Sequence, residues 1–180
     1  MPYTTLGYAA GCTEKVWLLA VVSAVVYRGQ DYWPKRFRRW MICQVAEQCS
    51  RICAAWYEEE ARGLGLPFPP LKERYERLEE TLQICHQMWG EQDGPFDGRY
   101  YHLARTLNSP QPITRPHPPI LIGGSGERKT LRLVARYADA CNIFDGPEVA
   151  HKLEILREHC EREGRDYSTI EKTFHSLGRI

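Results

Sequence analysis

The stretch Pro119–Phe144, PILIGGSGERKTLRLVARYADACNIF, decides the fold of this chain. Its first residues, PILIGG, predict a short buried strand, SGE predicts a tight turn, and RKTLRLVARYA predicts a helix. The apolar residues Leu131, Val134, Ala135 and Ala138 have the i, i+3, i+4 and i+7 spacing of one helix face. ACNIF then predicts a second strand. A strand, glycine loop, helix and strand within about 25 residues are typical of a right-handed parallel crossover.

The same pattern continues towards the C-terminus. A second helix is expected from Pro147, in its first turn, to Gly164, just past its end. Its inward positions are Val149, Leu153, Leu156 and Cys160. Thr173–Leu177 predicts the start of another strand. Repeated β–loop–α units indicate an α/β fold with a parallel sheet, either open or closed into a barrel.

A long amphipathic helix is predicted on the N-terminal side of the crossover. It opens at Pro69-Pro70 and ends at Gly90. Its apolar positions, which repeat every 3.6 residues, are Leu71, Tyr75, Leu78, Leu82 and Cys85. Near the start of the chain, the nine apolar residues LLAVVSAVV, Leu18–Val26, predict a buried strand because valine is abundant and the length is right.

Length and composition restrict the function classes. The 180 residues can bury a sizeable core, and a net charge of +1 excludes a nucleic-acid binder that works through bulk charge. A membrane-spanning helix needs about 20 apolar residues, so the nine-residue run Leu18–Val26 predicts no membrane segment. The 7 cysteines show no paired spacing and are expected to be free thiols, which favours a cytoplasmic protein.

The glycine loop Gly123, Gly124, Ser125 and Gly126 is the best candidate site. A strand ends there and a helix begins, so backbone N–H groups and the positive end of the helix dipole face one spot. Glycines would let a phosphate approach the backbone, and Ser125 adds a hydroxyl donor. The alternative is a tight turn between strand and helix that binds no ligand.

Two sharper phosphate motifs fit this loop incompletely. The dinucleotide fingerprint G-x-G-x-x-G would begin at Gly124, but its third glycine falls on Lys129. The nucleoside-triphosphate pattern G-x-x-x-x-G-K-[ST] would begin at Gly123, but its second glycine is Arg128. The sequence therefore argues against a nucleoside triphosphatase.

Other polar groups indicate no second site. The acidic run Glu58–Glu60 follows an expected strand end, but it also suits the solvated start of a helix. No metal site is predicted, because cysteines and histidines lack ligand spacing, and no Ser-His-Asp or Cys-His nucleophile stands out. His159 is expected on the surface of its helix and Cys160 in the core.

Three stretches together resemble the luciferase-like monooxygenase family, particularly its branch that uses the deazaflavin coenzyme F420. They are AAWYEEEARGLGLPFPPLKERYERLEETLQI, RPHPPILIGGSGERKTLRLVARYADACN and LREHCEREGRD, and they span most of residues 54–172. The resemblance implies a (β/α)₈ TIM barrel and an FMN or F420 cofactor at the carboxyl ends of the strands. It also implies that Gly123, Gly124, Ser125 and Gly126 hold the cofactor phosphate, and that Ala55 lies near the flavin ring at a strand end.

One segment departs from the family. Family members usually continue with a run such as HPxLLAKxxxTLDxLSGGRxxLGIGAAW, whereas Arg28–Cys53 has the right length, different residues and a local net charge of +4. Reading across codon boundaries, with permissive codon choice, converts residues 29–49 into PGLLAKAVSTLDDLSGGRAVF, which fits the family pattern. Our hypothesis is that residues 29 to about 52 are translated out of frame.

The sequence therefore predicts one partial luciferase-like barrel domain over residues 1–180. A complete barrel takes roughly 250 residues, and a barrel that lacks strands leaves unpaired edges, so we expect poor folding or aggregation of the chain alone. The expected function is a flavin- or F420-dependent oxidoreductase or monooxygenase that transfers hydride between the reduced cofactor and a small organic substrate or oxygen. The alternative is a non-catalytic phosphate-binding or assembly fragment of such a barrel. The resemblance allows a homo-oligomer for the intact parent, and the sequence identifies neither the substrate nor a catalytic acid or base.

Overall fold

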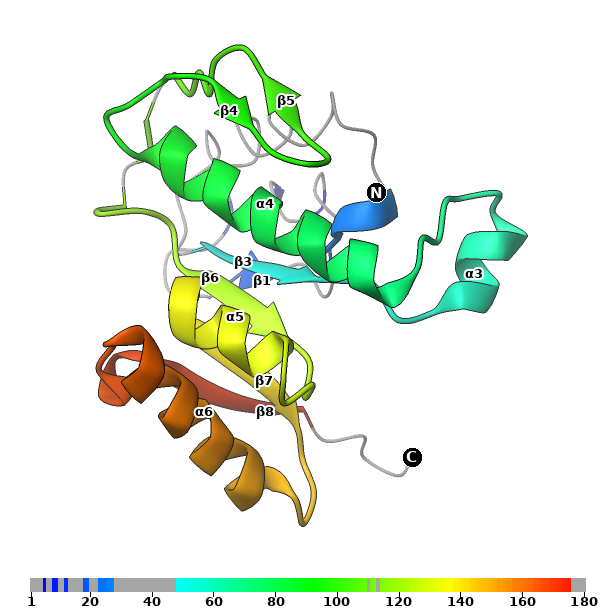
Figure 1. Cartoon of the computed structure of the whole chain (residues 1–180), viewed down its shortest axis with the longest axis vertical. Coiled ribbons are helices and arrows are strands. Elements are labelled where there is room, and N and C mark those ends of the chain that lie inside the picture. Colours follow the sequence, from blue (N-terminus) through cyan, green and yellow to red (C-terminus); the bar gives the residue numbers. More distant parts are fainter. Residues whose placement is uncertain are drawn as a thin grey trace. The chain divides into compact units, whose positions relative to one another are not determined.

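A computed structural model describes residues 5, 8, 9, 12, 18, 19, 23–27, 48–109, 111, 112 and 114–175 (Figure 1). The chain divides into two compact units. The first unit contains Met1–Cys49 and Ala54–Pro118, and the second contains Ser50–Cys53 and Pro119–Ile180.

A parallel sheet with two helices forms the second unit. Its strands are the Ser50–Cys53 part of β3 (Gln48–Cys53), β6 (Ile120–Gly123), β7 (Ala140–Phe144) and β8 (Glu171–His175). They pair in the order β3-β6-β7-β8, and every pair is parallel. The register places Ile122 beside both Ile52 and Cys141.

Helices α5 (Thr130–Tyr137) and α6 (Val149–Glu163) cross from strand to strand and lie side by side on one face of this sheet (Figure 1). The core between sheet and helices is apolar, because Ile122, Ile143 and Leu156 are fully buried. Helix α6 ends at Gly164, whose φ of 66° is the left-handed conformation common just after a helix. A short 3₁₀ helix, η2 (Tyr167–Thr169), leads into β8.

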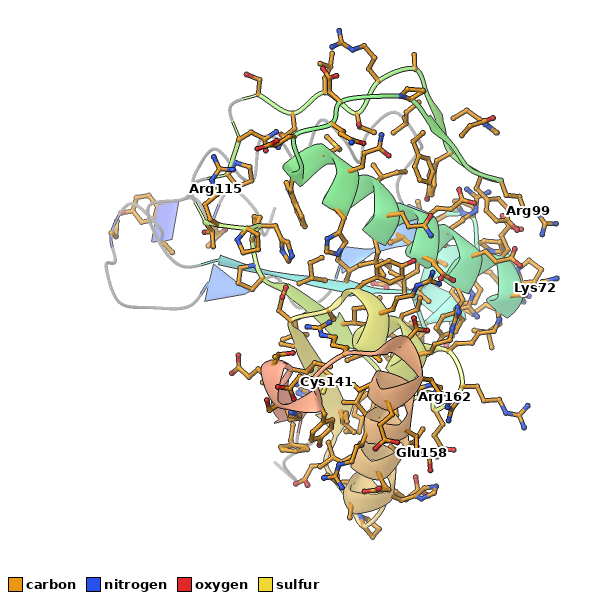
Figure 2. All side chains as sticks on the ribbon, turned by 60° about the vertical axis from the view of Figure 1, so that its left-hand side comes forward. Lys72, Arg99, Arg115, Cys141, Glu158 and Arg162 are labelled. Atoms are coloured by element: carbon orange, nitrogen blue, oxygen red, sulfur yellow. The ribbon has the colours of Figure 1, made fainter. Side chains whose placement is uncertain are left out.

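The first unit is built around α4 (Leu71–Trp89). It also contains α3 (Glu58–Gly63) and two short strands that form an antiparallel hairpin, β4 (Phe96–Asp97) and β5 (His102–Leu103). Near the start of the chain lie β1 (Leu18–Leu19), β2 (Ser23–Ala24) and the 3₁₀ helix η1 (Val25–Tyr27). β1 pairs with the first two residues of β3, and η1 packs against α4. Figure 2 shows Lys72 and Arg99 among the side chains of this unit, and both pair with Glu76.

Most of the predicted elements are confirmed. The strand ACNIF matches β7, and the helices expected over residues 70–90 and 147–164 match α4 and α6. The last strand is also present, but it begins at Glu171, two residues before the predicted start at Thr173. Five cysteines are free thiols in the part of the chain whose side chains the structure describes: Cys12, Cys53, Cys85, Cys141 and Cys160. Among the described residues, no helix is long and apolar enough to cross a bilayer.

Three expectations about single elements or residues were wrong. The run Leu18–Val26 is not one strand, because β1 and β2 are separate and Val25 begins a 3₁₀ helix. Leu71, expected to face inward, is 55% exposed because it is the first residue of α4. His159, expected on the surface, is only 7% exposed because its ring is turned towards a backbone carbonyl of a neighbouring loop.

Candidate functional site

The glycine loop lies at the carboxyl end of β6. Gly123 is the last residue of β6, and α5 begins at Thr130. Because β3, β6, β7 and β8 are parallel, their last residues Cys53, Gly123, Phe144 and His175 end at the same edge of the sheet. Ligands of α/β proteins bind outside this edge, so the loop occupies the expected position.

Gly124 has the backbone conformation that gives this loop its shape. Its φ is 129°, in the region that residues with side chains rarely adopt. A Cβ at this position would lie 3.4 Å from Cγ2 and 3.6 Å from Oγ1 of Thr130. The Gly124 N–H donates to the carbonyl of Asn142 on β7 at 3.0 Å. These are ordinary van der Waals distances, so it is the backbone conformation, and not lack of space, that favours glycine here.

Ser125 ties the loop to the end of β7. Its Oγ accepts a hydrogen bond from the Phe144 N–H at 3.1 Å. This bond occupies a lone pair of the oxygen and leaves the hydroxyl proton able to donate to a ligand. The loop is thus held to β7 at two neighbouring residues while Gly126 is exposed.

The charges around the loop favour an anion. Arg128 and Lys129 follow the glycines and are exposed at the start of α5, where the helix dipole is also positive. The Glu127 carboxylate lies 3.4 Å from Lys152 Nζ and 3.8 Å from His151 Nε2 on α6. The acidic side chain that directly follows the loop therefore has basic partners of its own.

Lys152 keeps its positive charge in this arrangement. Its hydrogen bond with Glu148, 2.8 Å long, raises the pKa of the Lys152 amine, and so does the Glu127 carboxylate. Partial burial lowers this pKa, but by less, so that the net shift is upward. The pKa of Glu148 is lowered by the same hydrogen bond and by the positive charge of Lys152. The pair stays ionised at neutral pH.

Side chains that the sequence did not single out extend the site along the same edge. Asn142 Nδ2 on β7 donates to Thr173 Oγ1 on β8 at 2.8 Å, and Thr173 donates to the Cys141 carbonyl at 2.8 Å. The rings of Phe144 and His175 meet edge to face, with centroids 5.9 Å apart. The sequence placed Phe144 at the end of a predicted strand, Thr173 at the start of another, and Asn142 and His175 within these strands, and it gave no other signal for them.

Ala55 lies in the first unit, two residues after the end of β3. Its φ is 69°, a left-handed conformation, and its carbonyl accepts a hydrogen bond from Nη1 of Arg74 at 2.7 Å. The structure therefore brings Gly123, Gly124, Ser125 and Gly126 together in one loop and describes Ala55 in the other unit. The assignment of Ala55 to a cofactor site stays a prediction.

The first unit also holds an aromatic cluster that sequence spacing did not indicate. The rings of His86 and His117 meet edge to face with centroids 4.8 Å apart, and His117 stacks on Trp89 at 5.6 Å. In the part of the chain that the structure describes, no group of three or more His, Cys, Asp or Glu side chains could hold a metal ion. The histidine pair belongs to the packing of α4 against the segment that follows it.

Comparisons with known proteins agree on one family. The family model described as luciferase-like monooxygenase matches residues 52–177. An FMNH(2)-dependent dimethylsulfone monooxygenase from Pseudomonas putida is 32% identical over 88 residues, which are 49% of this chain and 24% of that protein. An F420-dependent glucose-6-phosphate dehydrogenase from Nakamurella multipartita is 34% identical over 106 residues, 57% of this chain and 30% of that protein. The chain thus spans less than a third of these two relatives.

Solved structures show the same fold at low sequence identity. The coenzyme F420 dependent tetrahydromethanopterin reductase from Methanopyrus kandleri superimposes with a TM-score of 0.82 at 15% identity. The match covers 96% of this chain and 53% of the reductase. The prediction of an α/β fold built like part of a luciferase-like barrel is confirmed, and the chain spans about half of such a structure.

Proposed function

Since the chain belongs to the luciferase-like monooxygenase family, we propose that its glycine loop binds the phosphate of FMN or of coenzyme F420 and that the chain serves a cofactor-dependent oxidoreductase or monooxygenase. Relatives named for each cofactor support both choices. The substrate is a small organic molecule.

The conformation of Gly124 carries this proposal. A φ of 129° is a conformation that residues with side chains rarely adopt, and the absence of a side chain lets a ligand approach the backbone of the loop. The adjoining Ser125 hydroxyl can donate, and exposed Arg128 and Lys129 supply positive charge. This donor set fits a phosphate group, which is bound best by N–H, O–H and cationic donors.

The chain's own residues bind and orient, and the bound flavin or deazaflavin supplies the hydride or electron chemistry. Gly123–Gly126 would hold the phosphate, and the hydrogen bonds from Gly124 and to Ser125 fix the loop against β7. A phosphate held there would lie at the carboxyl edge of β6, beside the end of β7. Asn142 and Thr173 present polar groups at this edge.

We also place the protein in the cytoplasm, in line with the free thiols of Cys12, Cys53, Cys85, Cys141 and Cys160.

Replacement of Gly124 by alanine tests the loop assignment. Gly124→Ala places a residue with a side chain at a φ of 129° and so strains the backbone of the loop, and we expect FMN to bind at least about tenfold more weakly in a fluorescence titration. Gly164→Ala is the matched control. Gly164 is also left-handed, at 66°, but it ends α6 and has open space around its Cβ position. It should lose stability and keep its affinity for FMN.

The two variants separate binding from general damage. Equal affinity of wild type and Gly124→Ala for FMN and for F420 would refute the loop assignment. Turnover assays with reduced cofactor and oxygen, or with oxidised F420 and an alcohol or sugar phosphate, then distinguish an enzyme from a module that only binds phosphate.

A further inference from the structure

We propose that His159 is a positioning residue for the glycine loop, which it holds from α6 through the backbone carbonyl of Glu127. This inference rests on the proposed function, because it concerns how the same loop is kept ready for a phosphate. His159 Nε2 lies 2.8 Å from the Glu127 oxygen, across 32 residues of sequence. Glu127 directly follows the last glycine of the loop.

The chemistry of the contact fixes the proton on the ring. A carbonyl oxygen can only accept a hydrogen bond, so Nε2 of His159 must carry the hydrogen. Both the neutral Nε2–H tautomer and the imidazolium satisfy this requirement. The ring is 7% exposed, so solvent competes little for the bond.

His159 stands out from its neighbours on α6. Glu158 and Arg162 point to solvent from this helix and form an exposed pair at 3.0 Å (Figure 2). His159, one residue along, is turned inward. Lys152 lies on the same face of α6 as His159, and its side chain is 13% exposed. Its Nζ lies 3.4 Å from a carboxylate oxygen of Glu127. Helix α6 therefore contacts the main chain of Glu127 through His159 and its carboxylate through Lys152 and His151.

These contacts complete the tethering of the loop. Its first half is held to β7 by the Gly124 N–H and the Ser125 hydroxyl. Its second half is held to α6 by His159 at Glu127. Backbone N–H groups bind a phosphate well only when their directions are fixed before the ligand arrives, since ordering them on binding costs affinity. Loss of the α6 tether should therefore weaken phosphate binding.

Two amide variants test this role. In His159→Gln, the amide nitrogen can occupy the place of Nε2 and still donate to Glu127. In His159→Asn, the same amide is one methylene shorter and cannot reach. We expect the Gln variant to bind FMN within about threefold of wild type and the Asn variant about tenfold more weakly. Glu158→Gln, on the exposed face of α6, is the control and should match wild type.

The pair of variants distinguishes positioning from packing. A residue that only fills space would lower the melting temperature in both variants and leave the FMN affinity of the folded protein unchanged. Equal affinity of the folded Asn variant and wild type, or equal weakening in both variants, would overturn the proposal. Failure of wild type to bind either FMN or F420 would instead count against the proposed function.

A measurement on the wild-type protein covers the case in which the Asn variant does not fold. Nitrogen-15 NMR should show the His159 ring with a hydrogen on Nε2 that exchanges slowly with water. A ring that carries no hydrogen on Nε2 would overturn the proposal without any substitution, because the Glu127 carbonyl would then receive no donor.

Discussion

Ala55 is the one described non-glycine residue with a positive φ. Its value of 69° lies in the left-handed region, which costs a residue with a Cβ roughly 1–2 kcal/mol. Arg74 holds this conformation. Its side chain is 9% exposed, its Nη1 donates to the Ala55 carbonyl at 2.7 Å, and its guanidinium lies 4.1 Å from the ring centre of Phe68. A buried cation thus keeps the turn after β3 in a strained shape.

Ala55→Gly should relieve this strain. We expect the free energy of unfolding to rise by up to about 1 kcal/mol, because the left-handed penalty disappears and the added freedom of glycine in the unfolded chain offsets only part of the gain. Urea denaturation measures the change. Ala54→Gly, at a buried neighbour without positive φ, should instead destabilise by about 0.5–1 kcal/mol. Equal destabilisation by both would show that Ala55 is not strained.

Cys141 should make stability depend on alkaline pH. Burial raises the pKa of this thiol from 9.0 to about 11. The unfolded chain therefore releases the proton first, and stability is full below pH 9 and falls as the pH rises to about 11, by at most about 1.4 kcal/mol per pH unit for one thiol.

Urea denaturation from pH 8 to 11 checks this prediction. The free energy of unfolding of wild type minus that of Cys141→Ala should be constant below pH 9 and should fall above it. The exposed thiol of Cys12 offers the control: Cys12→Ala should leave the alkaline decline unchanged. A parallel decline in Cys141→Ala would contradict the assignment.

At the scale of elements, one carboxylate joins the β4–β5 hairpin to α4. Glu80 accepts hydrogen bonds from the backbone N–H groups of Arg99, Tyr100 and Tyr101 at 2.8, 3.0 and 3.0 Å. The hairpin strands have two residues each, too few to be stable alone. The turn between them therefore depends on a side chain about twenty residues earlier in the chain.

Glu80→Ala should release this hairpin. Three donors lose a charged acceptor, so we expect the free energy of unfolding to fall by about 2–3 kcal/mol in urea denaturation. Amide exchange should rise at Arg99, Tyr100 and Tyr101. Glu91→Ala, an exposed carboxylate just after α4, is the comparison and should change stability by less than about 0.5 kcal/mol. A similar loss of stability in Glu80→Ala and Glu91→Ala would show that it comes from removing a negative charge and not from the hydrogen bonds to the hairpin.

The sequence predicted those elements that are specified by residues close together in the chain. Periodic apolar positions identified α4, α5 and α6, and glycines marked the loop after β6. Features created by distant partners were not predictable. The β4–β5 hairpin depends on Glu80, and His159 is buried because its partner is a carbonyl 32 residues away. Likewise, serine at position 125 indicated a donor, but only the fold shows that it also accepts from Phe144.

At the scale of the whole molecule, the residues before and within β3 bear on whether the gene is read in one frame throughout. Gln48–Ile52 forms most of β3, and residues 29–47 lie outside the described residues, so the hypothesis of an altered reading frame stays a prediction. Ile52 is 1% exposed and pairs with Ile122, which suits a strand at this point.

Resequencing the gene tests the frame hypothesis. We expect one inserted or deleted base near codon 29 and a compensating change near codon 52, which together restore the family pattern in between. A DNA sequence that encodes residues 29–52 as printed, with no such changes, would contradict the hypothesis. The glycine loop lies outside this segment and is unaffected by either result.

The most direct test of the central claim compares FMN with riboflavin, which lacks only the phosphate. Fluorescence titration of the same protein preparation gives both dissociation constants. If Gly123–Gly126 hold the phosphate, FMN should bind at least about a hundredfold more tightly, since a phosphate with several charge-assisted hydrogen bonds contributes about 3 kcal/mol. Higher ionic strength should reduce the difference in affinity between FMN and riboflavin, because salt screens the charge of the phosphate. Equal affinity for FMN and riboflavin would contradict the account, because the loop would then make no use of the phosphate.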